Sequence, residues 1–217
     1  MKSSRALRIG AVFAAAVLAG LTLPPVTASS VTRAHDAKAG ELAEAFDCEG
    51  VAVKPGDNLA NVAASKPAGT TFCIAGGAYR VSSQIVVDSR DRFVGESPGS
   101  TSVTTTSAQL VFNASRSNEA HISGLDISGA TGSKSCHPKC GRGIWPGDNT
   151  TVSHVNVHHN AIQGIGGAGP GMLVEHSEIH RNGNEAFFGC CSAGVKSGKS
   201  YTIRDSYVLH NIGNGIW

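Results

Sequence analysis

The chain has 217 residues, of which 41% are hydrophobic but only 6% aromatic, and it carries 18 Lys and Arg against 16 Asp and Glu. Three of those basic residues and none of the acids lie in the first 28 positions, so the remainder has 15 basic against 16 acidic residues. This balance excludes the basic surface that a nucleic-acid-binding protein needs. The length fits a single domain.

Residues 1–28 predict a secretory signal peptide. A basic start precedes an apolar run from Ile9 to Leu23, and Ala28 ends a small-residue cleavage site. The run is shorter than the roughly 20 residues that a membrane-spanning helix needs, and its alanine content is typical of a bacterial leader. We therefore expect a secreted, extracellular protein with no membrane attachment once the leader is removed.

The mature chain begins with a segment that carries no hydrophobic period. Residues 29–47 are expected to form a flexible lead, and residues 48–217 one folded domain. Residues 57–65 predict a short helix, because a capping residue precedes an apolar face of Leu59, Val62 and Ala63. Short strands are expected next, at residues 71–74, 77–81, 85–87, 92–94 and 109–112.

A repeat dominates the second half of the chain. Residues 151–160, 173–182 and 202–211 align with their apolar positions in register, after a weaker copy at 122–127, and they end in Asn160, Asn182 and Asn211. A second element of the type Gly-Ile or Gly-Val accompanies the copies, at residues 143–145, 164–166, 194–196 and 215–217. Each unit thus contains several short strands that are separated by tight corners.

One such unit cannot bury its inward face alone, because alternate side chains of a strand point to opposite sides. Coils that stack about 4.8 Å apart would pair their backbones in parallel sheets and share one core. The equivalent asparagines would then form a ladder of amide groups, and we expect them to adopt the left-handed conformation at their corner. An ordinary β-sandwich core is the alternative.

The Val-x-x-Val-x-Val-x-x-Asn and Gly-Ile pattern resembles the repeat of the pectin-lyase-like superfamily over residues 70–217. The resemblance implies an all-β protein, a right-handed parallel β-helix or solenoid. Residues 48–70 would form an N-terminal cap with the short helix over the open end, and residues 71–217 the coils. Because Trp217 falls inside a Gly-Ile element, we expect a C-terminal end that is truncated or covered by a partner.

The six cysteines all follow the leader, where an oxidising compartment favours disulfides. Cys48 and Cys73 flank the predicted helix, and we expect a bond between them worth ~3 kcal/mol. The other four lie in two insertions, residues 131–142 and 183–192, at the same point of the repeat: Cys136, Cys140, Cys190 and Cys191. Bonds between the loops and a local Cys136–Cys140 bond are both open. A zinc site with His137 is a further alternative, against which the irregular spacing argues.

The register assigns outward side chains to columns, with one residue from each coil. Asp126 and Glu178 share a column with Asn156 between them, so their separation is about 9.6 Å, twice the coil spacing. Inverting glycosidases place their two carboxyl groups at a similar distance. Asp126 and Glu178 are therefore candidates for hydrolysis, with solvated surface acids as the alternative.

The superfamily resemblance also implies lyase chemistry, in which an Arg or Lys acts as the base and carboxylates hold calcium. Arg204, Arg181 and Lys196 are candidate bases, and Asp205 with Glu175 could hold calcium as a cofactor. The stacked Glu175 and Arg204 are alternatively a surface salt bridge.

Four residues are candidates for binding the substrate. Trp145 offers a flat ring for a sugar, or packs between coils, and Lys196 lies in the same outward column. His154 and His176 occupy equivalent positions of successive coils and could act in binding or proton transfer. Copying of residues between repeats also explains this pair.

These features lead us to expect a monomeric, carbohydrate-active β-helix protein, either a polysaccharide lyase or a glycoside hydrolase, acting on an extracellular polysaccharide. The alternative from a different class is a non-catalytic scaffold or adhesin that binds glycans or the cell wall. The expectation of an enzyme depends on the resemblance in fold alone.

Overall fold

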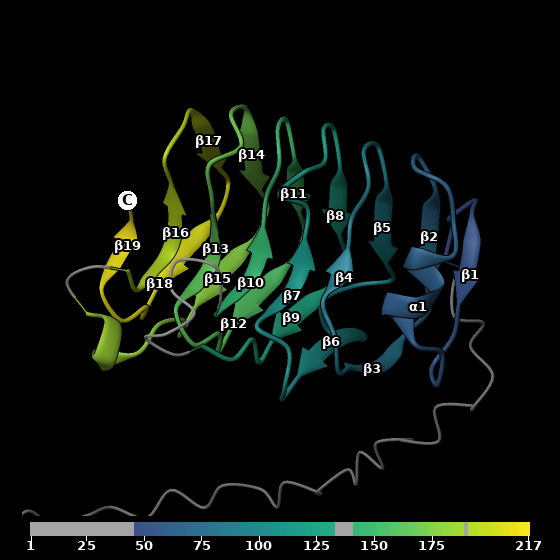
Figure 1. The fold of residues 1–217 in the computed structure, drawn as a ribbon, viewed down its shortest axis with the longest axis horizontal. Coiled ribbons are helices and arrows are strands. Elements are labelled where there is room, and N and C mark those ends of the chain that lie inside the picture. The colour runs from purple at the N-terminus through teal and green to yellow at the C-terminus, as the bar shows by residue number, and fades with distance from the viewer. Residues whose placement is uncertain (1–45, 133–140, 189–190) are drawn as a thin grey trace, which may run out of the picture. The chain divides into compact units, whose positions relative to one another are not determined.

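The computed structural model describes residues 46–132, 141–188 and 191–217, which all lie in one compact unit, Ala43–Trp217. The described chain winds into a right-handed parallel β-helix (Figure 1). Each full coil contributes one strand to each of three parallel sheets, here named A, B and C. The predicted fold class is thereby confirmed.

The strands follow one another around the coil in the order A, B, C. Sheet A contains β1 (Val51–Val53), β2 (Thr71–Ile74), β5 (Arg92–Gly95), β8 (His121–Ser123), β11 (Thr151–Ser153), β14 (Met172–Glu175) and β17 (Tyr201–Arg204). Sheet B contains β3 (Gly77–Val81), β6 (Thr101–Thr105), β9 (Asp126–Ser128), β12 (Asn156–His158), β15 (Glu178–His180) and β18 (Tyr207–Leu209). Sheet C contains β4 (Ile85–Val86), β7 (Leu110–Asn113), β10 (Arg142–Trp145), β13 (Gln163–Gly167), β16 (Ala193–Ser197) and β19 (Asn214–Ile216).

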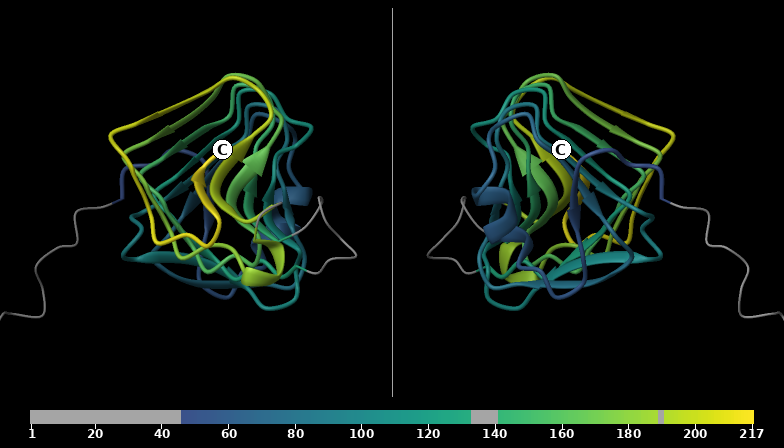
Figure 2. Two further views of the ribbon diagram at one scale, coloured as in Figure 1. Left: turned by 90° about the vertical axis from the view of Figure 1, so that its left-hand side faces the viewer. Right: turned by 90° about the vertical axis from the view of Figure 1, so that its right-hand side faces the viewer.

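The core lies between the three sheets and consists of residues in exact register from coil to coil. Val152 pairs with Val174 in sheet A, and Val157 pairs with Ile179 in sheet B. All four side chains are fully buried. Viewed along the stack, the successive coils follow one common outline (Figure 2), and the strand pairing places equivalent inward residues in register.

The tight corners use left-handed residues, but these are not the asparagines. His159, Arg181 and His210 have φ of 51°, 50° and 53° and lie at the corner between sheets B and C. Asn160, Asn182 and Asn211 are the residues that follow them. The expectation that the asparagines themselves are left-handed is therefore wrong: the preceding residue makes the bend, which turns the asparagine side chain inward.

The three asparagines form a hydrogen-bonded ladder inside this corner. Asn160 Nδ2 donates to Asn182 Oδ1 at 2.9 Å, and Asn182 Nδ2 donates to Asn211 Oδ1 at 3.0 Å. The same oxygens accept the backbone N–H groups of Asn160 and Asn182 at 3.1 and 2.9 Å. Asn182 Nδ2 also donates to Val157 O at 2.8 Å. The amides thus satisfy backbone groups that the corner removes from the sheets.

The N-terminal end of the core is covered by α1 (Leu59–Ala64), which contacts β4. Asn58 is the capping residue, because its side chain accepts a hydrogen bond from the backbone of Asn61 at 3.1 Å. Leu59 and Ala63 are buried as expected, whereas Val62 is only partly so. The predicted Cys48–Cys73 disulfide is present and ties β2 to the segment before β1.

Two strands have no counterpart in the sequence-based expectations. β6 runs through a Ser- and Thr-rich segment, and its inward positions Thr101, Val103 and Thr105 are all buried. Because two of these three side chains are polar, the segment lacks the alternating apolar pattern that identified the other strands. β1 pairs with β2 inside the region that was expected to be cap alone.

The two insertions approach each other over the middle coil at their described ends. Gly132 and Gly141, from the first insertion, both lie against the Ile162 side chain. Cys191, at the end of the second, packs on the same residue and is disulfide-bonded. The predictions for Cys136, Cys140 and Cys190, and those for the signal peptide and the flexible lead, lie outside the described residues.

Replacement of Asn182 by alanine tests the ladder. We expect Asn182→Ala to lower the free energy of unfolding by about 3 kcal/mol, because the buried Val157 carbonyl and the Asn160 N–H lose their partners. Urea unfolding followed by circular dichroism measures this difference.

The matched control is Asn156→Ala, which removes an outward side chain from β12 and should change the free energy by less than about 0.5 kcal/mol. Equal effects of the two substitutions would contradict the structural role of the ladder.

Candidate functional site

The outer face of sheet C carries an extended hollow. Its outward column contains Val86, Asn113, Trp145, Gly166 and Lys196, each from the next coil. Parallel pairing places these side chains in a line along the stack. The hollow consists of two adjoining pockets that share Trp145 and Ala168, and we call it the sheet C groove.

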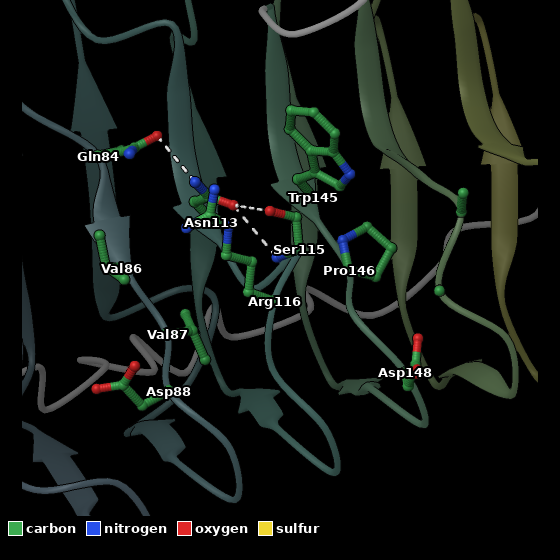
Figure 3. Close-up of a pocket in the computed structure, with 12 residues that line it drawn as sticks. Gln84, Val86, Val87, Asp88, Asn113, Ser115, Arg116, Trp145, Pro146 and Asp148 are labelled. Carbon is green, nitrogen blue, oxygen red and sulfur yellow. Dashed lines mark hydrogen bonds between the residues drawn. The ribbon is translucent and has the colours of Figure 1, made fainter.

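The first pocket has a volume of about 820 Å³ and lies between β4 and the loop after β13 (Figure 3). Its wall carries amide and hydroxyl groups. Asn113 Nδ2 donates to Gln84 Oε1 at 3.2 Å, and Asn113 Oδ1 accepts from Ser115 Oγ at 2.7 Å. Because these contacts hold Asn113 between its neighbours, its amide is oriented before any ligand arrives.

Charged residues also line this first pocket. Asp88 and Asp148 lie at opposite ends of it, and Arg116 comes from the turn between them (Figure 3). Both carboxylates belong to exposed residues of the loops that connect sheet C to sheet A. The pocket therefore offers two acids and one cation to a bound molecule.

The second pocket, of about 350 Å³, lies beyond Trp145 and is lined by Arg142, Gln163 and Lys196. The Arg142 guanidinium carbon lies 4.4 Å from the centre of the Trp145 ring, and Arg142 Nε donates to Gln163 Oε1 at 2.7 Å. Burial lowers the pKa of Arg142 to about 10, so the guanidinium remains charged at neutral pH. This part of the groove is cationic.

Of the residues proposed from sequence, Trp145 and Lys196 lie in the groove. Trp145 is half-buried at the junction of the two pockets. Lys196 Nζ lies 3.1 Å from the centre of the Trp217 ring, in the next coil. Burial, and then the charge of Arg142, lower the pKa of Lys196.

The proposed hydrolytic pair lies on sheet B, on a different face. Asp126 and Glu178 are in register with Asn156 between them. His158 Nε2 donates to Asp126 Oδ1 at 2.8 Å, and His158 Nδ1 lies 2.7 Å from His159 Nδ1. Asp126 is thus engaged in a local network of imidazoles instead of facing a pocket.

Of the remaining candidates, Arg181 lies at the corner between sheets B and C, and the others lie along sheet A and its corner to sheet B. Arg204 bonds Glu175 through two nitrogens, at 2.8 and 2.5 Å, so the salt-bridge alternative is the observed arrangement. His154 and His176 stack with ring centres 5.0 Å apart, and with Asp205 they are the left-handed residues of this corner, at φ of 52°, 47° and 48°.

The acids near Arg204 do not fit a calcium site. Calcium takes six to eight oxygen ligands, whereas the Glu175 carboxylate is already held by Arg204. Within the described ranges no group of three or more His, Cys, Asp or Glu side chains could hold a metal ion. The disulfide at Cys191 also removes that sulfur as a thiolate ligand for zinc.

Several residues of the groove had no sequence signal of their own. Gln84 and Asn113 belong to coils whose repeat pattern is weak, and Arg142 is the last residue of an insertion. Asp88 and Asp148 lie in loops of different coils, 60 positions apart in the sequence. Both aspartates lie at the corner between sheets C and A. The sequence does not predict this shared position, because the coils differ in length.

Comparison with known proteins identifies no family for this chain. No model of a protein family matches it, and a search of curated proteins finds no match either. Two solved pectin methylesterase structures align with it. The first, a mutant in complex with a hexasaccharide, has 13% identity and a TM-score of 0.46 over 74% of this chain and 68% of that chain. The second, also in complex with a hexasaccharide, has 14% identity and a TM-score of 0.45 over 75% and 66%. In the described part of the chain, no helix has the length and hydrophobicity needed to cross a membrane.

His121 predicts a pH dependence of stability. Burial, and then the charge of Arg92, lower its pKa from 6.5 to about 4. The folded state therefore keeps His121 neutral while the unfolded state takes up a proton, so this contribution to stability is complete above pH 6.5 and is lost as the pH falls toward 4. We expect His121→Gln to reduce the fall in melting temperature between pH 7 and pH 4.5.

Because other groups titrate in the same range, the wild type and the variant are compared at both pH values. His210→Gln, at an exposed position of the last coil, is the matched control, and its melting temperature should fall between the two pH values by as much as that of the wild type. If the melting temperature of His121→Gln fell between pH 7 and pH 4.5 by as much as that of the wild type, His121 would not be a source of the pH dependence.

Proposed function

We propose that this protein binds an extracellular polysaccharide in the sheet C groove. The observation that carries the proposal is the position of Trp145 at the junction of two pockets that follow the coil axis. A groove along the stack presents the side chains of a new coil about every 4.8 Å, and an extended chain of sugar units can follow it.

The chemistry of the lining supports a sugar chain. The flat face of Trp145 offers apolar surface to a sugar ring while its edge remains near polar groups. Gln84, Asn113 and Ser115 present oriented amide and hydroxyl groups that can exchange hydrogen bonds with sugar hydroxyls. Arg142 and Lys196 add positive charge at one end.

We further propose that the protein works outside the cell. The basic start and the apolar run of residues 1–28 are those of a secretory leader. The Cys48–Cys73 disulfide is the kind of bond that forms and persists in an oxidising compartment.

Truncation of Trp145 tests the binding proposal. We expect Trp145→Ala to weaken the affinity for a soluble uronate polysaccharide by about tenfold or more, because the central aromatic contact is lost. Affinity electrophoresis or calorimetry measures the change. Tyr207→Ala, which removes an exposed aromatic ring from sheet B, is the matched control and should bind as the wild type does. Equal affinities of all three proteins would refute the groove.

A second candidate function is cleavage of the bound polysaccharide. The observation that favours it is the presence of Asp88, Asp148 and Arg116 in the larger pocket. Two carboxyl groups could serve as acid and base in hydrolysis, and an arginine could stabilise a developing negative charge.

Incubation with uronate polysaccharides separates the two functions. New absorbance from unsaturated ends indicates a lyase, and new reducing ends without it indicate a hydrolase. We expect Asp148→Asn to abolish any such activity and Asp205→Asn, on another face, to retain it. Tight binding without either product would leave binding as the function.

A further inference from the structure

Arg142 is a buried cation whose charge is not matched by a carboxylate within the described chain. The residue is only 6% exposed. Its Nε donates to a neutral amide, Gln163 Oε1, and its plane lies near the Trp145 ring. Its Nη1 is buried and, among the described residues, has no hydrogen-bond partner. Buried charges are normally paired because their desolvation is costly, so this arrangement points to an absent anionic partner.

The surrounding residues hold Arg142 in one orientation. Gln163 Nε2 donates to Cys191 O at 2.8 Å, which fixes the amide so that its oxygen faces Arg142. A side chain at Gly166 would collide with Gln163 Oε1 and would lie 3.3 Å from Arg142 Nε. The glycine therefore leaves room for the Arg142–Gln163 pair.

The two glycines of β13 also create a notch in the outward column. Gly166 stands where Trp145 and Lys196 stand in the adjacent coils. A Cβ at Gly167 would lie 2.8 Å from the Trp145 ring. The resulting space, about 350 Å³, is bounded by Arg142, Trp145, Gln163 and Lys196, and we call it the notch.

The notch carries two positive charges and, among the described residues that line it, no acid. The lowered pKa of Lys196 is due first to burial and then to the charge of Arg142, so the two cations repel each other. An anion placed between them would relieve this repulsion and supply the missing partner.

We propose that the notch is a subsite for one anionic group of the sugar chain, a carboxylate or a sulfate ester, held by Arg142 and Lys196 while its ring lies on Trp145. This inference rests on the proposed function, because the notch is one end of the sheet C groove. The bidentate geometry of a guanidinium suits either anion.

The neighbouring pocket limits where further charges can lie. On the other side of Trp145 the groove is lined by two acids, Asp88 and Asp148, and by one cation, Arg116, so acids are in excess there. A polymer with a negative charge on every sugar would bring like charges together there. The preferred ligand is therefore a chain in which charged and neutral sugars alternate.

The fluorescence of Trp145 provides a direct test. The chain contains only two tryptophans, so Trp217→Phe leaves Trp145 as the single reporter and keeps an aromatic ring beside Lys196. In this background, at low salt, we expect glucuronate or glucose 6-sulfate to change the emission in a saturable manner and neutral glucose to have no effect. Saturation by only one of the two anions identifies the group for which the notch is built.

Lys196→Gln should weaken the binding of the anion by about tenfold or more, whereas Lys199→Gln, which removes an exposed lysine three positions away, should leave it unchanged. Arg142→Met should also weaken it, and its melting curve shows whether this buried substitution is folded. Equal responses to glucose and glucuronate, or unchanged affinity in Lys196→Gln, would overturn the proposal.

Binding measurements with polysaccharides distinguish a failure of the notch from a failure of the proposed function. We expect hyaluronate, in which charged and neutral sugars alternate, to bind more tightly than polygalacturonate, in which every sugar is charged. Loss of polymer binding in Trp145→Ala, together with no response to either small anion, would leave the groove standing and refute the notch. Failure of the wild type to bind any polymer would refute the proposed function itself.

Discussion

The structure depends on one constraint: each coil must pair with the next in the same register. Hydrogen bonds between parallel strands run along the stack, so a shift of one residue would turn every inward side chain outward. The asparagine ladder fixes this register at one corner, because Asn182 Oδ1 and Asn211 Oδ1 each accept from both the backbone and the side chain of the preceding asparagine. The left-handed residue before each asparagine directs its amide inward.

The same constraint creates the outer surface. Outward residues of successive coils lie directly above one another. A difference in side-chain size between coils therefore produces a ridge or a hollow along the column. In sheet C the sequence Asn113, Trp145, Gly166, Lys196 gives an amide, a ring, a gap and a cation in succession. This irregular column, and not the repeated one, forms the groove. Histidines copied between coils instead stack on each other, as His154 does with His176.

The sequence was informative where the repeat is regular. The apolar positions and asparagines of residues 151–211 predicted the parallel coils and the columns, and the flanking positions of Cys48 and Cys73 predicted their disulfide. It was uninformative for β6, where threonines replace apolar residues inside the core. The sequence pattern favoured Asp126 and Glu178 as a catalytic pair because they share an outward column. In the structure, Asp126 is paired with His158. Asp88, Asn113 and Arg142 line the same groove only because insertions and corners of unequal length bring them to one face, and no local sequence pattern predicts this.

The most direct measurement is a crystal structure of the protein with an oligosaccharide of alternating uronate and neutral sugars. We expect the sugar chain to follow the sheet C groove, with one ring on Trp145 and its carboxylate between Arg142 and Lys196. An oligosaccharide bound along sheet A or sheet B, with the sheet C groove empty, would contradict this expectation.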